Sequence, residues 1–311
     1  MLSAAPARTQ PPVIADCHVL PPDNIWNRRI DHLPLDPNSD QYVATIGADK
    51  PLVPDFGAGL FQRGPIGIPF VVVSSQPAVP IVFTDYGDES DPGPYPVPPQ
   101  APIEGGPQSK GDRHVLTLDR DHCILYELFN AFPQSDGSWK ASSGAVFNLA
   151  SNALRPAGWT STDAAGLPVV PGLVRYDEAA AGAIHHAIRF TVPQSRRAYV
   201  WPATHFASSL TDPKYPPMGQ RFRLRADFDL SGFSPLNQVI LRALQQYGML
   251  LADNGSSWFI SGAPDDRWNN DNLRELRRVH GSDFEAVDSS SLELASDSGA
   301  AKGEPRRPIR R

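Results

Sequence analysis

The stretch DRHVLTLDRDHCILYELF, residues 112–129, decides the fold class of this chain. It contains two runs rich in β-branched and large apolar residues, Arg113–Asp119 and Cys123–Phe129, which only Arg120, Asp121 and His122 separate. Runs of this length and composition are typical of strands, and a polar loop of this size is typical of a hairpin. The stretch therefore predicts an antiparallel β-hairpin.

The rest of the chain repeats this pattern of short apolar runs between turn residues. The chain has 33 Pro and 24 Gly in 311 residues, and so much proline disfavours long helices and continuous central strands. Further strands are expected at Ile68–Val73, Val79–Thr84, Gly144–Leu149, Ile184–Val192, Arg197–Trp201, Arg221–Arg225, Met249–Ala252 and Trp258–Ser261. The prediction is a mainly β fold, an antiparallel β-sandwich or jelly roll with two or three peripheral helices.

Three segments show helical signals. Ser234 is in a capping position before Pro235, an apolar stripe at helical spacing follows, and Gly248 closes the segment. Ser39 is expected to start a second helix that ends before Gly47, and a more polar helix is expected from Asp271 to His280.

Length and composition favour one domain with flexible ends. We expect a disordered spacer at residues 1–16, one β-rich catalytic domain at residues 17–288, and a flexible tail or linker at residues 289–311. The first residues lack the apolar core of a signal peptide but resemble the spacer that follows one. Together with the low lysine content, this favours a secreted protein.

The two cysteines, Cys17 and Cys123, allow two interpretations. They are either buried free thiols, as in a cytosolic protein, or a disulfide that ties the N-terminal arm to a core strand. The disulfide is the favoured prediction, and such a bond stabilises a fold by typically ~2–4 kcal/mol.

Charge and hydropathy exclude several classes of partner. The formal net charge is −6, and the basic residues Arg306, Arg307, Arg310 and Arg311 gather only at the C-terminal end, where a solvated tail is the simplest interpretation. No basic face for nucleic acid and no run of 18 apolar residues for a membrane is present in the sequence. A monomer without nucleic-acid or membrane partners is expected.

The predicted hairpin carries candidate catalytic groups. Period 2 places Asp112 and His114 on one face, so the carboxylate can orient the ring, although a salt bridge at the strand end explains the pair equally well. Glu127 lies between Leu125 and Phe129 on one face. If it is buried, its pKa is raised and suits a general acid; if the strand is at an edge, Glu127 reaches solvent.

The segment Asn152–His205 contains many polar groups among apolar runs. Buried polar groups need partners, so this density predicts the wall of a polar cleft. We expect Asp163 as a reserve catalytic carboxyl, although His186 among apolar residues also fits a core histidine. The expected substrate-binding residues are Arg155, Trp159, Arg175, His186, Trp201 and His205.

Metal and cofactor chemistry is not expected. His185 and His186 point to opposite faces of a strand and cannot bind one ion together with His114 and His205 without a bulge. No HExxH, CxxC, GxSxG, P-loop or dinucleotide motif stands in context. The acidic loop Asp85–Gly111 fits a solvated loop, a cleft wall or, less well, a metal loop.

Two segments carry a resemblance to known proteins. LRPAGWTSTDAAGLPVVPGLVRYDE (154–178) and LNQVILRALQQYGMLLADNGSSWFISGAPDDRW (236–268) resemble a family of secreted bacterial proteins without an assigned activity, over roughly Cys17–Asp288. That family is similar in setting to extracellular carbohydrate-active enzymes. The resemblance implies export and a polysaccharide partner, and it assigns no catalytic residue.

The sequence-based hypothesis is therefore an extracellular glycoside hydrolase. Asp112 and Glu127 would be the paired carboxyl groups, with Asp163 in reserve, and His114, His186 and His205 would tune protonation or bind hydroxyls. The alternatives are a polysaccharide lyase that uses His or Tyr with Arg, a non-catalytic carbohydrate-binding module that uses the tryptophans, and a metal-dependent enzyme.

Overall fold

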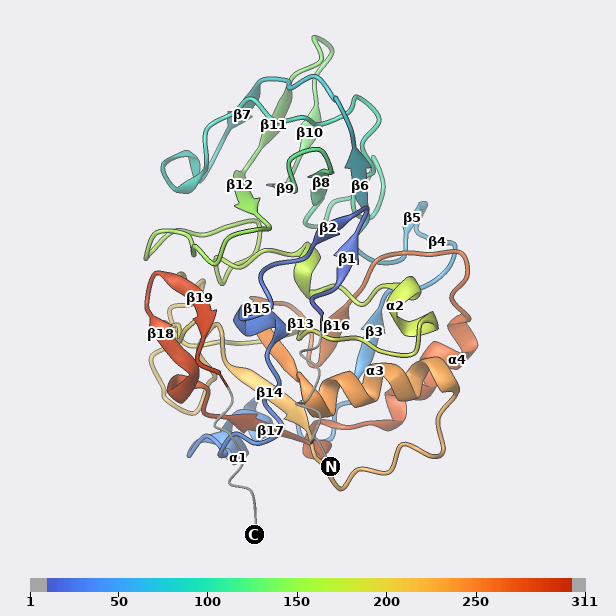
Figure 1. Cartoon of the computed structure of the whole chain (residues 1–311), viewed down its shortest axis with the longest axis vertical. Coiled ribbons are helices and arrows are strands. Elements are labelled where there is room, and N and C mark those ends of the chain that lie inside the picture. The colour runs from blue at the N-terminus through green and yellow to red at the C-terminus, as the bar shows by residue number, and fades with distance from the viewer. Residues whose placement is uncertain (1–9, 304–311) are drawn as a thin grey trace, which may run out of the picture.

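The architecture is a stack of β-sheets along the long axis of the molecule (Figure 1). The structure is a computed structural model that describes residues 10–303. Its elements are mainly strands, with four α-helices and several single-turn 3-10 helices among the described residues. The predicted mainly β class is confirmed. Four strand pairs are parallel, β6 with β8, β7 with β11, β13 with β15 and β3 with β16, so the sheets are mixed rather than wholly antiparallel.

The predicted hairpin forms the centre of a four-stranded sheet with the order β12-β9-β8-β6. Its strands are β6 (Phe70–Val73), β8 (Val115–Asp119), β9 (Ile124–Phe129) and β12 (Ser143–Asn148). β8 and β9 pair antiparallel, with Leu116 opposite Glu127. Apolar side chains fill both faces of the sheet, which therefore lies inside the molecule between two other layers.

The upper layer is a three-stranded sheet with the order β10-β11-β7. It consists of β7 (Ile81–Phe83), β10 (Phe132–Pro133) and β11 (Trp139–Ala141). Trp139 and Ala141 pack with Val115, Leu128 and Tyr95 in a small separate core between these two sheets. The long loop 85–111, which follows β7, supplies Tyr95 to that core and is therefore anchored.

The lower lobe is built on a six-stranded sheet with the order β17-β14-β15-β13-β16-β3. Its strands are β3 (Val53–Asp55), β13 (Ile188–Val192), β14 (Arg221–Leu224), β15 (Met249–Asn254), β16 (Phe259–Ser261) and β17 (Phe284–Val287). Phe190, Phe222 and Trp258 pack together in its core. The predicted strand Arg197–Trp201 is wrong, because Tyr199 forms only an isolated bridge with Met218. The backbone of this segment instead bonds to the chain around Leu210 and Met218 without forming a strand.

Helices cover the six-stranded sheet from outside (Figure 1). The helices are α1 (Ser39–Ile46), α2 (Tyr176–Ala180), α3 (Pro235–Gln246) and α4 (Asn270–Arg274), and α4 continues as a 3-10 turn at Glu275–Arg278. The apolar stripe of α3 is buried, and Gly248 has a φ of +64° where the chain turns into β15. The sequence predicted α1 and α3 closely, but placed α4 and its 3-10 continuation in one longer helix and missed α2.

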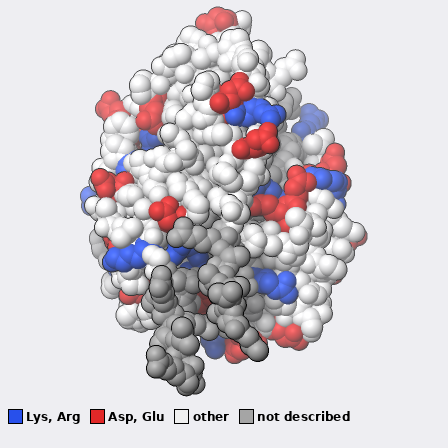
Figure 2. All heavy atoms as spheres, viewed as in Figure 1, with Lys and Arg blue, Asp and Glu red and all other residues white. Residues whose placement is uncertain are grey.

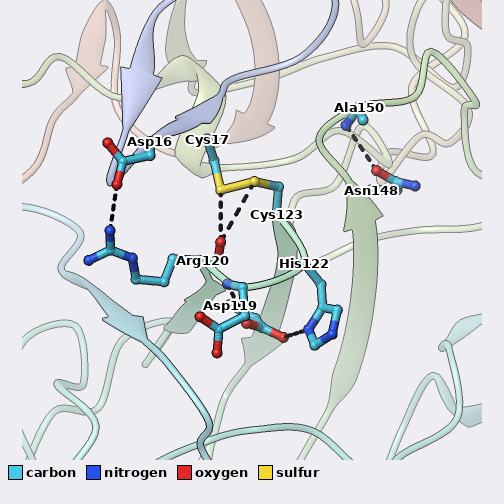
Figure 3. Close-up of a disulfide and its surroundings, with 9 residues drawn as sticks. Asp16, Cys17, Asp119, Arg120, His122, Cys123, Asn148 and Ala150 are labelled. Atoms are coloured by element: carbon cyan, nitrogen blue, oxygen red, sulfur yellow. Dashed lines mark hydrogen bonds and ion pairs between the residues drawn. A yellow bond between two sulfur atoms is a disulfide. The ribbon is translucent and has the colours of Figure 1, made fainter.

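A disulfide joins the N-terminal segment to the turn between β8 and β9 (Figure 3). Cys17 lies in β2 (Cys17–His18), which pairs with β1 (Val13–Ile14), and its sulfur is bonded to that of Cys123. Arg120 and Asp16 form an ion pair beside the bond. The favoured disulfide prediction is confirmed.

The ends of the described chain are more ordered than the sequence suggested. The predicted flexible tail is wrong for residues 289–303, which form the hairpin of β18 (Glu293–Ala295) and β19 (Ser298–Ala301). Ala301 donates its amide hydrogen to the Asp23 carbonyl, so this hairpin closes over the N-terminal segment. The predicted spacer is wrong for residues 10–16, which include β1, whereas residues 1–9 and 304–311 lie outside the described residues.

The visible face of the molecule carries acidic and basic side chains interspersed, without a broad basic patch (Figure 2). Within residues 10–303, no helix combines the length and the apolar character needed to cross a bilayer.

Candidate functional site

One face of the six-stranded sheet carries a row of polar side chains across three neighbouring strands. Asp55 in β3 is the register partner of Ser261 in β16, and Arg189 in β13 donates a hydrogen bond to the Ser261 hydroxyl at 2.6 Å. The backbone pairing therefore sets these three side chains side by side. They face the loop that holds Asp163, which is also the loop that meets the four-stranded sheet.

Arg189 and Asp163 form a buried ion pair at the base of this row. Arg189 Nε lies 2.8 and 2.9 Å from the two carboxylate oxygens, and Nη2 donates to one of them as well. The Asp163 side chain is 0% exposed, and Arg189 supplies every hydrogen bond that its carboxylate accepts within residues 10–303. The pair is thus an internal, bidentate contact that holds neighbouring side chains in position and does not itself bind a substrate.

A further carboxyl group, that of Asp253 in β15, lies beside this ion pair. It lies 3.5 Å from Arg189 Nη2, and its side chain is 20% exposed. Burial, followed by the neighbouring Asp163 carboxylate, raises the pKa of Asp253 well above the ordinary 3.8 of an aspartate, and Arg189 only partly offsets this. Asp253 is therefore a carboxyl that can hold a proton near neutral pH and still reach solvent.

The opposite wall is formed by His114 and Glu104. His114 is 1% exposed; its Nδ1 lies 2.6 Å from Glu104 Oε2, and its Nε2 lies 2.9 Å from the Thr162 carbonyl oxygen. Burial disfavours the charged ring, but the Glu104 carboxylate prevails and raises the pKa of His114 to about 10. Because both ring nitrogens face acceptors, both carry hydrogens and His114 is an imidazolium.

This protonation state bears on metal binding. Glu104, Asp112 and His114 place ligand atoms within 4.8 Å of one another, a spacing that a cation could span. A histidine coordinates a metal through a neutral nitrogen with a free lone pair, and His114 has none to offer while it bonds to Glu104 and Thr162. The three residues fit a hydrogen-bonded imidazolium better than a metal centre.

Two further carboxylates open to solvent at the same place. Asp55 and Asp112 are both exposed, and neither side chain has a hydrogen-bond or ion-pair partner among the described residues. Partial burial, followed by the Glu104 carboxylate, raises the pKa of Asp55. Asp55 is thus an accessible carboxyl within reach of the charges of Glu104, Arg189 and Asp112. We call the set Asp55, Glu104, Asp112, His114, Asp163, Arg189 and Asp253 the acidic recess.

Glu127 lies behind the acidic recess and not in it. It is 0% exposed and accepts hydrogen bonds from the amides of Val169 and Val170 and from the Thr162 hydroxyl at 2.9–3.1 Å. Burial raises its pKa to about 7, so the expected pKa shift is confirmed and the alternative of a solvated edge is wrong. With no accessible surface, Glu127 acts on the recess only through Thr162, whose carbonyl holds His114.

The expected substrate-binding residues divide into separate internal networks. Arg155 bonds to Asp91 and to the carbonyls of Glu89 and Thr160, and its guanidinium stacks near Trp159. His205 lies 4.0 Å from Glu89. Because protein groups already saturate Arg155, this network is a brace for the Trp159–Asp163 loop.

Arg175 and His186 belong to a second network. Both bond to Glu178, at 2.7 and 3.3 Å, and His186 also faces the Ala187 carbonyl. Burial alone would raise the pKa of Glu178, but Arg175 lowers it to about 2. His186 is thus a partnered core residue. Trp201 lies elsewhere and donates its ring N–H to the Ser298 carbonyl.

Sequence reasoning found three members of the acidic recess, Asp112, His114 and Asp163, and missed the other four. Glu104 lies in the acidic loop for which a cleft wall was one interpretation. Arg189 lies on the polar face of the predicted strand Ile184–Val192, a signal that could have identified it. Asp55 and Asp253 end short apolar runs, and nothing local distinguishes them from ordinary strand-end carboxylates.

A separate hollow lies away from the acidic recess. A groove of about 220 Å³ lies near α1, lined by Leu35, Ser39, Asp40, Val43, Ala44, Ala48, Arg225, Ser282, Phe284 and Glu285. None of these residues belongs to the recess, and the groove contains no unpartnered buried group that points to a reaction. Comparisons with family models, curated proteins and solved structures found no significant match to this chain.

Proposed function

We propose that the protein is a secreted glycoside hydrolase that acts on a polysaccharide, with the acidic recess as its active site. One observation carries the proposal: Asp253, a largely buried carboxyl with a raised pKa, and Asp112, an exposed carboxylate without a partner among the described residues, belong to one cluster of interacting charged groups. Glycoside hydrolysis needs such a pair, one carboxyl to protonate the leaving oxygen and another to attack the sugar or to activate water.

In this proposal Asp253 is the general acid, and Asp112 is the nucleophile or base. The Asp112 charge is among the influences that raise the pKa of Asp253, so deprotonation of one opposes that of the other. Asp163 with Arg189, and Glu104 with His114, are positioning pairs. Glu127 supports His114 through Thr162 and has no direct contact with substrate.

The other sequence-based alternatives fit the recess less well. A lyase needs a cation free to neutralise a uronate carboxylate, whereas Arg189 is 5% exposed and already paired with Asp163. A binding module that uses the tryptophans needs them exposed in a strip, whereas four of the six are buried and Trp159 and Trp201 are half-buried in separate places. The disulfide supports an oxidising compartment and hence export.

The test is a screen of the purified full chain against a panel of plant and microbial polysaccharides, with product analysis. Asp112→Asn and Asp253→Asn should each lower kcat by at least about a hundredfold. Asp212→Asn, which changes an exposed carboxylate outside the recess, should not. Activity should also fall as the pH rises through the raised pKa of Asp253. Full activity in either recess variant would contradict the assignment.

A further inference from the structure

The hairpin of β4 (Leu60–Phe61) and β5 (Gly64–Pro65) projects from the body with apolar side chains on both of its faces. Gln62 and Arg63 form its turn with φ values of +49° and +71°, as a tight two-residue turn requires. Leu60 is 72% exposed and Phe61 is 67% exposed. Consecutive strand residues point to opposite faces, so the two exposed side chains lie on opposite faces of the hairpin.

The base of this hairpin is fixed rather than loose. A Cβ at Gly64 would lie 2.0 Å from the carbonyl carbon of Gly105, so the two glycine backbones are in direct contact. On the other side, the Asn270 side chain bonds to both the amide and the carbonyl of Ala58, at 2.9 and 3.0 Å. The projecting position of Phe61 is therefore built into the fold.

The contact with Gly105 also joins the hairpin to the acidic recess. Gly105 directly follows Glu104, the carboxylate that holds His114. At the other end of the hairpin, the chain comes from Asp55, which is the exposed carboxylate at the end of β3. Figure 1 shows β4 and β5 at the side of the molecule, at the level between the two lobes. One strand of the hairpin thus follows a recess residue along the chain, and the other contacts the residue next to Glu104.

We propose that the β4–β5 hairpin is a substrate-binding arm, in which the Phe61 ring stacks on the apolar face of a sugar in the chain whose scissile bond lies in the acidic recess. This inference rests on the proposed function. The recess itself offers charged and polar groups, and substrate sites generally add apolar surface to such groups. An exposed aromatic ring beside the recess supplies that surface, and it loses contact with water only when a sugar covers it.

Binding and turnover test the arm separately. Binding is measured by retardation in gels that contain each polysaccharide of the panel, in an Asp112→Asn background so that the ligand is not consumed. Phe61→Ala should weaken binding about tenfold, and in the otherwise wild-type enzyme it should raise KM about tenfold with kcat within twofold. Leu294→Ala, which shortens another exposed apolar side chain on β18, should leave both unchanged.

Each outcome decides the inference. Equal retardation of Phe61→Ala and its parent overturns it, as does the absence of retardation by every polysaccharide tested. If Phe61→Ala instead changes the elution volume of the protein from that of a dimer to that of a monomer, the hairpin is a self-association surface and the inference is wrong. If the protein binds a polysaccharide through Phe61 but hydrolyses none, the arm stands and the proposed hydrolase function fails.

Discussion

Removal of the Arg189 guanidinium tests the electrostatics of the acidic recess. Arg189→Met keeps the length of the side chain and leaves the Asp163 carboxylate, which is 0% exposed, without its hydrogen-bond donor. Breaking a buried ion pair by removal of one partner costs about 3–5 kcal/mol, because a bare charge stays buried. We expect the free energy of unfolding at pH 7 to fall by about this amount.

The reverse substitution should cost less. In Asp163→Asn, Arg189 keeps a hydrogen bond to Ser261 at 2.6 Å and the Asp253 carboxylate at 3.5 Å. The double variant removes both charges, so no unpaired charge stays buried. Its loss of unfolding free energy should therefore be smaller than the sum of the losses in the two single variants. Acidification should also restore part of the stability of Arg189→Met, because a neutral carboxyl is cheaper to bury than a carboxylate.

Urea unfolding, followed by the fluorescence of the buried tryptophans, measures all three variants at pH 7 and pH 5. A loss below about 1 kcal/mol for Arg189→Met at pH 7 would show that water reaches Asp163, contrary to its burial. Additive losses in the double variant would equally refute the coupling of the pair.

Three further predictions concern stability. Paired replacement of Cys17 and Cys123 by Ser should lower the free energy of unfolding by about 2–5 kcal/mol, because the bond closes a loop of 106 residues in sequence separation; an unchanged urea midpoint would contradict this. Glu104 should stabilise the fold fully through His114 below pH 6.5, and this stabilisation should be lost as the pH rises towards the folded pKa of His114, about 10. In unfolding curves between pH 6 and pH 10.5, His114→Gln should not show this pH-dependent loss of stability. The pKa of Glu127 is raised from 4.5 to about 7, so its contribution is most favourable below pH 4.5 and is lost as the pH rises through 7; Glu127→Gln should unfold with a flatter pH dependence across this window, and identical profiles would count against a buried carboxyl.

Local patterns predicted those elements whose partners are close in sequence. The β8–β9 hairpin follows from two alternating runs around a three-residue loop, and α3 follows from a proline start, an apolar stripe and a closing glycine. Each signal lies within about 20 residues, so a window along the chain contains all of it. No such window contains both strands of the parallel pairs β6 with β8 and β3 with β16, because long connections separate these strands in the sequence.

The acidic recess could be predicted only in part for the same reason. Asp163 and Arg189 are 26 residues apart, and Asp253 is a further 64 residues away, so their meeting depends on the order of strands in the six-stranded sheet. Asp55 joins them through a parallel pair across the sheet. Only Asp112 and His114 share a short segment, and this is why the sequence singled them out together.

The density of polar residues in Asn152–His205 predicted a cleft, and the structure shows what that density does instead. Most of these groups are satisfied within the protein: Arg155 by Asp91, Arg175 and His186 by Glu178, and Arg189 by Asp163. A buried polar group must find a partner, but that requirement does not say whether the partner is protein or ligand. The unpartnered and accessible carboxylates, Asp55 and Asp112, lie outside that segment. Polar density therefore locates the framework of a site, whereas the groups left without protein partners indicate where a substrate binds.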